Sequence, residues 1–179
     1  DKIHLIPNGV DTNLFRPCTP DEQIATQEKL NLQTDGRPLI VFCGELSPRK
    51  RPHLLVEALV GLRECTAVIV GPVGDPVYVE NMKGRAKQLG VDDRIFWHGH
   101  STQIDQYYRA ADIFCLPSSN EGLPNAALEA MASGLPLVMT AFPGAADLIE
   151  DGKNGRIVDA CPDAIAEALR DHLAQPRLH

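Results

Sequence analysis

Two carboxylates, Glu121 and Glu129, flank a short segment that is typical of a helix entrance. Pro124 stands where a first helical residue is expected, because its missing N–H costs nothing there, and Gly134-Leu135-Pro136 is typical of a helix end. The N–H groups of residues 125–127 would then lack partners and favour an anion. Two acceptor carboxylates beside a phosphate site suit a nucleotide-sugar, which has hydroxyls at both ends. The alternative is two solvated glutamates on an ordinary helix.

A cationic loop provides the second candidate group. Arg49, Lys50 and Arg51 follow Gly44 at the entrance of a helix expected over residues 51–63. Cations are unfavourable beside the positive end of a helix dipole, so this arrangement predicts a partner anion such as a phosphate. A solvated run of charges is the competing interpretation.

Strands and helices must alternate to position these groups. Apolar runs predict strands at 38–43, 66–71, 94–98, 112–116, 136–140 and 155–158. Helices are expected at 21–30, with Asp21 near its cap, and at 51–63, 76–89, 103–110, 124–133, 144–150 and 162–174. This order predicts an α/β, Rossmann-like parallel sheet of about six strands with helices on both faces. Each candidate group follows a strand, so both are expected where ligands bind in such sheets.

The composition narrows the class of protein. The 179 residues include 44% apolar and 23% charged residues, and the net charge of −7 disfavours nucleic acid as a partner. No apolar run approaches the roughly 20 residues that span a bilayer. The five cysteines are scattered, so we expect neither disulfides nor structural zinc, and a reducing cytosol.

Metal chemistry is not indicated by the remaining motifs. His98 and His100 alternate along a predicted strand, but no third ligand is evident beside them. The sequence also has no Asp-x-Asp motif that would hold a diphosphate through a metal. We therefore expect no metal and no other cofactor. Arg94 is expected to cap the helix before it or to pair with Asp92.

The glutamate segment resembles a known family signature. Glu121-x7-Glu129, with Gly122-Leu123-Pro124 inside it, is similar to the signature of GT-B retaining glycosyltransferases of family 4, the "glycosyl transferases group 1" type. The likeness extends from Ile6–Asp11 to Gly152–Gly155, and so covers most of the chain.

The resemblance implies a division of the chain. Residues 18–174 would be the carboxyl-terminal, nucleotide-sugar-binding domain, and residues 1–17 would connect it to an N-terminal domain that this sequence lacks. Residues 175–179 would form a tail. The acceptor would be bound by the N-terminal domain, so this chain alone is expected to turn over little or nothing.

Roles for individual residues also follow from the resemblance. Glu121 would bind the donor-sugar hydroxyls and, with Lys50, form the catalytic pair, while Glu129 would accept from the ribose hydroxyls. Lys50, with Arg49 and the N–H groups after Gly122, would stabilise the diphosphate. The full set of expected nucleotide-sugar-binding residues is Gly44, Arg49, Lys50, Phe96, Trp97, Glu121, Gly122, Leu123, Pro124, Asn125 and Glu129. Phe96 to His98 would line the base pocket, largely through backbone groups.

The sequence departs from the family pattern in two loops. Glu45 stands where the family commonly has a phosphate-binding arginine, so Arg49 is expected to supply the charge while Glu45 orients Arg49 or Arg51. The family usually carries Gly-Gly and a glutamate in the loop at 140–147, where this chain has Pro143-Gly144 and Asp147. Val70–Asp75 is interpreted as a plain turn.

The resemblance implies a hexosyl-type glycosyltransferase that transfers a sugar, with retention, from a UDP-, GDP- or ADP-sugar to a glycan, lipid or small molecule. It would act in carbohydrate or cell-envelope biosynthesis, in the cytoplasm or peripherally at the inner face of the membrane, with membrane association only through the absent half. The alternatives are a GT-B-type nucleotide-sugar epimerase and a non-catalytic nucleotide-binding module.

Overall fold

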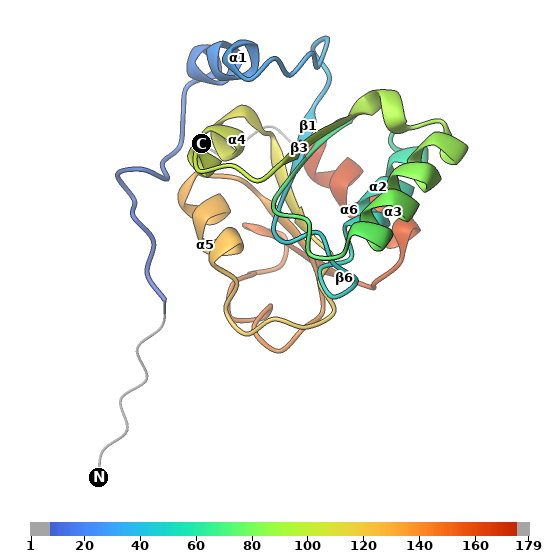
Figure 1. The fold of residues 1–179 in the computed structure, drawn as a ribbon. Coiled ribbons are helices and arrows are strands. Elements are labelled where there is room, and N and C mark those ends of the chain that lie inside the picture. Colours follow the sequence, from blue (N-terminus) through green and yellow to red (C-terminus); the bar gives the residue numbers. More distant parts are fainter. Residues whose placement is uncertain (1–7, 175–179) are drawn as a thin grey trace.

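The computed structural model describes residues 8–174, which form a parallel sheet between two layers of helices (Figure 1). The strands are β1 (Leu39–Cys43), β2 (Thr66–Val70), β3 (Ile95–Gly99), β4 (Ile113–Leu116), β5 (Leu137–Thr140) and β6 (Gly155–Val158). The helices are α1 (Pro20–Lys29), α2 (Pro52–Ala58), α3 (Pro76–Leu89), α4 (Ile104–Ala110), α5 (Asn125–Ala132) and α6 (Pro162–Leu173). Two short 3₁₀ helices are η1 (Leu59–Gly61) and η2 (Asp92–Arg94).

The strand order within the described residues is β3-β2-β1-β4-β5-β6, and every pairing is parallel. The chain moves outward from β1 through β2 to β3, and then returns to place β4 on the other side of β1. The connections after β1 and after β4 therefore diverge at a topological switch point, where open α/β sheets bind their ligands. This confirms the predicted Rossmann-like class and brings the two candidate loops to one place.

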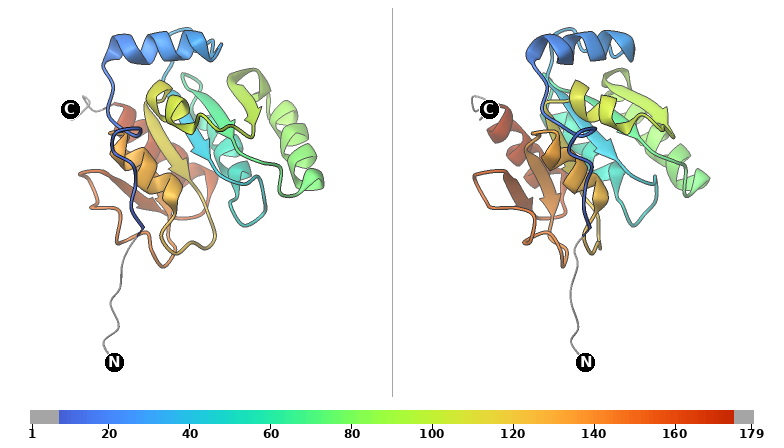
Figure 2. Two further views of the ribbon diagram at one scale, coloured as in Figure 1. Left: turned by 60° about the vertical axis from the view of Figure 1, so that its left-hand side comes forward. Right: turned by 90° about the vertical axis from the view of Figure 1, so that its left-hand side faces the viewer.

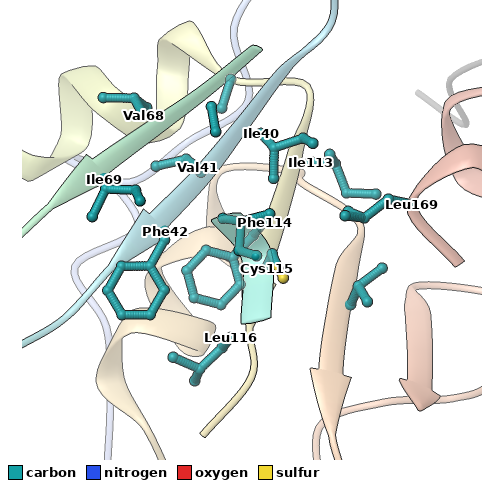
Figure 3. Close-up of a cluster of buried hydrophobic side chains, with 14 of the residues drawn as sticks. Ile40, Val41, Phe42, Val68, Ile69, Ile113, Phe114, Cys115, Leu116 and Leu169 are labelled. Atoms are coloured by element: carbon teal, nitrogen blue, oxygen red, sulfur yellow. The ribbon is translucent and has the colours of Figure 1, made fainter. Parts of the chain in front are cut away.

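The core is built from the strands at the centre of the sheet. All residues of β1, β2, β4 and β5 are buried, as expected for strands covered on both faces. Figure 3 shows part of this core, in which Phe42 of β1 lies beside Phe114 of β4, and Leu169 of α6 approaches from the other side. The apolar runs form strands because branched and aromatic side chains pack well on a pleated, buried surface.

The helices divide between the two faces of the sheet (Figure 2). Helices α2, α3 and α6 pack together on one face, while α4 and α5 cover the other, with α1 packed outside α4. Residues 8–19 run along α5, where the Pro17 side chain lies against Gly134. Residues 1–7 of the predicted connection and the predicted tail, 175–179, lie outside the described residues.

The predicted elements agree with the structure to within about one residue, with a few exceptions. The helix expected over 51–63 ends at Ala58 and continues only as η1. Helix α1 is capped by Thr19 through a capping box, and Asp21 lies near this cap, in the first turn, as expected. Pro124 is the cap residue of α5, in extended conformation, and the helix begins at Asn125.

The helix predicted over 144–150 is wrong. That segment consists of turns, in which the Ala145 N–H bonds to the Phe142 carbonyl at 3.0 Å and the Leu148 N–H to the Ala145 carbonyl at 3.1 Å. Gly144 disfavours a helix, and its backbone lies so close to the Gly122 carbonyl oxygen that the segment is held in turns instead. The strand β5 is thus followed by a compact turn.

The expectation for Arg94 is also wrong. Its guanidinium is buried and donates to the carbonyls of Leu59, Leu62 and Cys65, at 2.8, 2.6 and 3.0 Å. Arg94 therefore satisfies the carbonyls at and after η1, not the preceding helix α3 or Asp92. Its three hydrogen bonds make burial of the charge tolerable and fix the start of β3.

Candidate functional site

The loops after β1 and β4 are joined by an ion cluster. The Glu121 Oε1 atom lies 2.6 Å from Lys50 Nζ and 2.9 Å from Arg49 Nη1. The Glu121 and Lys50 side chains are only 10% and 12% exposed, whereas that of Arg49 is 50% exposed. Pairing in partly buried surroundings is worth more than on an open surface. The structure thus brings together three of the residues that the sequence singled out.

Backbone hydrogen bonds hold the same two loops in register. The Arg49 carbonyl accepts from the Ser119 N–H at 2.8 Å and from the Ser119 hydroxyl at 3.0 Å. The Arg49 guanidinium returns a hydrogen bond to the Asn120 carbonyl at 3.1 Å. Since this contact is reciprocal, the position of Glu121 relative to Lys50 does not depend on the ion cluster alone.

Glycines permit the loops to pack this closely. A Cβ added to Gly71, after β2, would lie 1.8 Å from the Gly44 carbonyl oxygen, so no side chain fits there. A Cβ on Gly44 would lie 3.7 Å from the Cδ and Cε atoms of Lys50, which places the lysine stem over this glycine. The Gly71 segment, interpreted from the sequence as a plain turn, is therefore a packing partner of the Lys50 loop.

The turn after β5 supports the Glu121 loop in a similar way. A Cβ added to Gly144 would lie 1.6 Å from the Gly122 carbonyl oxygen. The Thr140 hydroxyl, at the end of β5, also donates to the Ser118 carbonyl at 2.6 Å. The segment with Pro143-Gly144 in place of the family's usual glycines thus contacts the site loop through its backbone.

Helix α5 begins at this site, and some N–H groups of its first turn have no hydrogen-bond partner among the described residues. The first N–H groups of a helix have no intrahelical partner. However, the Ala127 N–H bonds to the Pro124 carbonyl at 3.0 Å, so of the three N–H groups predicted to be free, only those of Asn125 and Ala126 have no hydrogen-bond partner among residues 8–174. The Asn8 amide donates to Asn125 Oδ1 at 2.9 Å, so the incoming segment also contacts the helix mouth.

Glu129 lies further along α5, on the side of this helix that faces α4. Its Oε2 atom accepts a hydrogen bond of 3.0 Å from the hydroxyl of Tyr108, which is fully buried on α4. Burial raises the pKa of the Glu129 carboxyl, and the Tyr108 hydrogen bond acts in the opposite direction. Sequence reasoning did not find Tyr108, because a tyrosine on a neighbouring helix has no fixed spacing from Glu129.

The expectation that Glu45 orients Arg49 or Arg51 is wrong. Among residues 8–174, Glu45 forms no ion pair, and its Cγ and Cδ atoms lie 2.6 and 2.7 Å from the point where a Gly74 Cβ would stand. Its exposed side chain extends over Gly74, at the loop after β2, while Arg49 pairs with Glu121 instead. Glu45 is therefore held by packing against a glycine rather than by a cation.

The aromatic side chains of β3 make their contacts away from the two loops that carry the ion cluster. The Trp97 indole donates to Asp92 Oδ1 at 3.2 Å and lies beneath the Lys83 ammonium of α3, 5.8 Å from the ring centroid. The His98 ring packs on Tyr107 at 4.7 Å, and Phe96 is half-buried against the core. Because Asp92 precedes β3, the Trp97 side chain points away from the carboxyl end of that strand. The structure does not bring this side chain to the ion cluster.

A cavity of about 500 Å³ lies elsewhere, at the amino ends of the strands. Its lining includes Pro38, Asp112 and Pro136, which directly precede β1, β4 and β5. None of the predicted site residues lines it, so the ion cluster lies at the opposite, open edge of the sheet.

Residues 8–174 contain no cluster of three or more potential metal ligands, and no helix among them is long and apolar enough to cross a membrane.

The site has the chemistry of an anion-binding switch point. Two cations and the Glu121 carboxylate meet where the loops after β1 and β4 join, and Glu129 lies further along α5. Within the described part of the chain, the N–H groups of Asn125 and Ala126 at the start of α5 have no hydrogen-bond partner. Such a site can neutralise a diphosphate and accept hydrogen bonds from hydroxyls on either side of it. A parallel sheet with this arrangement is the Rossmann-like half of a GT-B glycosyltransferase.

The chain belongs to the family described as glycosyl transferases group 1, whose model matches residues 23–179. It is 36% identical over 190 residues to a D-inositol 3-phosphate glycosyltransferase from Xylanimonas cellulosilytica, covering 99% of this chain and 45% of that protein. The chain thus spans about half the length of the curated relative it matches.

Solved structures agree with this assignment. The crystal structure of Anabaena Alr3699/HepE in complex with UDP and glucose superposes with a TM-score of 0.85 at 26% identity, over 94% of this chain and 46% of that one. The carboxyl-terminal domain of the group 1 glycosyl transferase LpcC from Francisella tularensis gives a TM-score of 0.80 at 29% identity, over 93% of this chain and 89% of that domain. The chain therefore has the fold of a GT-B carboxyl-terminal domain.

Proposed function

We propose that this chain binds the nucleotide-sugar donor of a retaining, hexosyl-type glycosyltransferase at the edge between β1 and β4. The observation that carries the proposal is the ion cluster, in which Glu121 bridges Lys50 and Arg49 from two loops of the sheet. Family membership and the UDP complex of the similar Anabaena protein support a nucleotide-sugar as the ligand.

The geometry suggests how each group contributes. The donor diphosphate takes the place of the Glu121 carboxylate between Lys50 and Arg49, and the N–H groups of Asn125 and Ala126 approach it from the helix mouth. As the glycosidic bond breaks, negative charge grows on the diphosphate, and these donors stabilise it. Because they are held by two loops and a helix, little reorganisation is needed during the reaction.

The carboxylates then contact the ends of the donor. Glu121, released from the cations, accepts hydrogen bonds from the sugar hydroxyls and fixes the anomeric carbon. Glu129 accepts from the ribose hydroxyls. Neither role requires a metal or another cofactor, and the expectation that none is used stays a prediction.

The acceptor and any further catalytic group are proposed to come from another part of a longer protein. The length of the curated relative supports this, since this chain covers 45% of it. The isolated chain is then expected to bind nucleotide with little turnover.

A cytoplasmic location is also proposed. It is supported by the odd number and the scattered positions of the five cysteines in the sequence.

The test is a panel of UDP, GDP and ADP, each alone and as a sugar conjugate, in thermal-shift and calorimetric titrations of the 179-residue chain. One nucleotide is expected to stabilise the chain and to appear, in a soaked crystal, between Lys50 and Asn125. Absence of binding by every nucleotide, or density at another edge of the sheet, would contradict the proposal. Product analysis of a longer protein with labelled donor then separates transfer from epimerisation and from binding alone.

A further inference from the structure

Tyr108 stands behind the carboxylate that is proposed to bind the ribose. Its side chain is fully buried, and its ring lies between those of Phe15, at 5.9 Å, and Phe114, at 6.0 Å. Its hydroxyl donates to Glu129 Oε2 at 3.0 Å. The ring cannot move without disturbing two aromatic contacts, so the hydroxyl is a fixed donor.

A phenylalanine would meet the packing needs of this position. The aromatic contacts involve only the ring, whereas the buried hydroxyl requires a partner of its own. Burial raises the pKa of the Tyr108 phenol well above its ordinary value, so the hydroxyl keeps its proton across the physiological range. The Glu129 carboxylate thus has a permanent hydrogen-bond donor on one of its oxygens.

The second oxygen of Glu129 is differently placed. Among residues 8–174, Oε1 has no hydrogen-bond partner and is not buried, while Oε2 is held by Tyr108. A carboxylate fixed at one oxygen presents the other in a defined direction. This is the arrangement needed to accept from a pair of neighbouring hydroxyls.

We propose that Tyr108 is a positioning residue that fixes Glu129 Oε1 toward the ribose hydroxyls of the nucleotide. The inference rests on the proposed function, since it needs a nucleotide at this edge of the sheet. It adds that preference for a ribonucleotide depends on a hydroxyl that contacts no part of the ligand.

The hydrogen bond from Tyr108 also affects the pKa of Glu129, which it lowers against the effect of burial. The titratable groups that interact with its carboxyl are the Tyr108 phenol of α4 and the Cys43 thiol of β1. The strands β4 and β5, on which α5 also packs, contribute none within the described part of the chain. No cation opposes the effect of burial, so the Tyr108 hydroxyl is the group that favours the ionised carboxylate.

Tyr108→Phe tests the proposal, with Tyr107→Phe as the matched control. Tyr107 is the preceding residue and is also buried, but its hydroxyl interacts with Ser101 rather than with Glu129. Calorimetry would compare the nucleoside diphosphate bound by the unaltered chain with its 2′,3′-dideoxy analogue, between pH 5 and 8. Tyr108→Phe is expected to weaken binding of the ribonucleotide about 10-fold, the scale of a hydrogen bond to a charged group.

The dideoxy analogue distinguishes positioning from a structural role. It lacks the hydroxyls that Glu129 accepts from, so its affinity should be unchanged in Tyr108→Phe. The loss of ribonucleotide affinity on acidification should also begin at a higher pH than in the unaltered chain. Equal loss for both ligands, or no loss for either, would overturn the proposal, as would an equal effect of Tyr107→Phe.

A second measurement requires no nucleotide. NMR titration of the Glu129 carboxyl carbon should show a higher pKa in Tyr108→Phe and an unchanged one in Tyr107→Phe, and an unchanged value in both contradicts the inference. If Tyr108→Phe does not fold, Glu129→Asp, whose carboxylate is one methylene short of the phenol, should lose the ribose preference instead. Failure of the unaltered chain to bind any nucleotide would refute the proposed function, and this inference with it. Normal binding by Tyr108→Phe refutes the inference alone.

Discussion

Lys50 Nζ and Glu121 Oε1 lie 2.6 Å apart. This ion pair joins the residue expected to bind the diphosphate to the residue expected to bind the sugar. Arg49 shares the same carboxylate oxygen at 2.9 Å. Glu121 therefore lies between the two cations, at the position proposed above for the donor diphosphate. Under the proposed function, the donor diphosphate would replace the Glu121 carboxylate between the cations, so the loss of this contact would offset part of the Coulomb energy gained.

Glu121→Gln should tighten binding of a nucleoside diphosphate. The variant removes a carboxylate that competes for Lys50 and Arg49 and repels the phosphates. The affinity for the nucleoside diphosphate is expected to rise about 5-fold, which corresponds to roughly 1 kcal/mol, the upper range measured for charge pairs exposed to solvent. Calorimetry at low and high salt would measure it. Glu150→Gln, at an exposed carboxylate that pairs with Lys153, is the matched control. Weaker binding by Glu121→Gln would show that this carboxylate contacts the nucleotide favourably.

Lys50→Ala should have the opposite effect. Removal of the ammonium deletes a charge-assisted contact to the diphosphate, and a loss of about 10- to 100-fold in affinity is expected. Arg51→Gln removes a neighbouring cation for which no ion pair is found among the described residues, and should change the affinity little. Titration calorimetry of both variants is the measurement. Wild-type affinity in Lys50→Ala would exclude this lysine from the site.

Gly144→Ala should distort the Glu121 loop, although Gly144 itself is not expected to contact the ligand. The added Cβ would lie 1.6 Å from the Gly122 carbonyl oxygen, so the backbone of the Glu121 loop must shift. We expect a Tm lower by several degrees and a loss of most nucleotide affinity. Gly84→Ala is the control, because a Cβ there meets nothing within 4 Å and the position lies inside α3. Alanine should be neutral or stabilising at that position by about 0.5–1 kcal/mol. A Gly144→Ala chain with normal Tm and affinity would show that the turn after β5 does not support the site.

Glu129→Gln should raise stability near neutral pH. Burial raises the folded-state pKa of Glu129 above its unfolded value, so the folded chain binds more protons than the unfolded chain between the two values. Stability therefore falls as the pH rises through that window, and the ionised carboxylate is destabilising above it. Thermal melts from pH 4 to 8 should show a Tm advantage of a few degrees for Glu129→Gln at neutral pH, which disappears toward pH 4. An advantage that does not depend on pH would contradict this assignment.

The sequence predicted the fold better than it predicted contacts. The six strands were placed to within about one residue, because buried parallel strands are continuous apolar runs between helical stretches. The turn at 144–150 was mistaken for a helix because its composition is compatible with both. Its close contact with Gly122 depends on a loop that is distant in sequence.

The candidate site was predicted in its residues but not in its pairings. Lys50 and Glu121 were each found from a local motif, yet nothing local indicates that they share an ion pair across the switch point. Glu45 was assigned to Arg49 because charge patterns are readable along a chain, whereas its packing against Gly74 is not. Tyr108 was missed for the same reason, since its contact with Glu129 exists only after α4 and α5 pack.

Phe15 belongs to the segment at residues 8–19, and its ring packs edge-on against Tyr108, with 5.9 Å between the ring centroids. The hydroxyl of the same tyrosine donates to Glu129 Oε2 at 3.0 Å, so Tyr108 contacts both that segment and the carboxylate. A shift of the incoming segment would thus change how firmly the carboxylate is held. One aromatic side chain therefore links residues 8–19 mechanically to a carboxylate on α5.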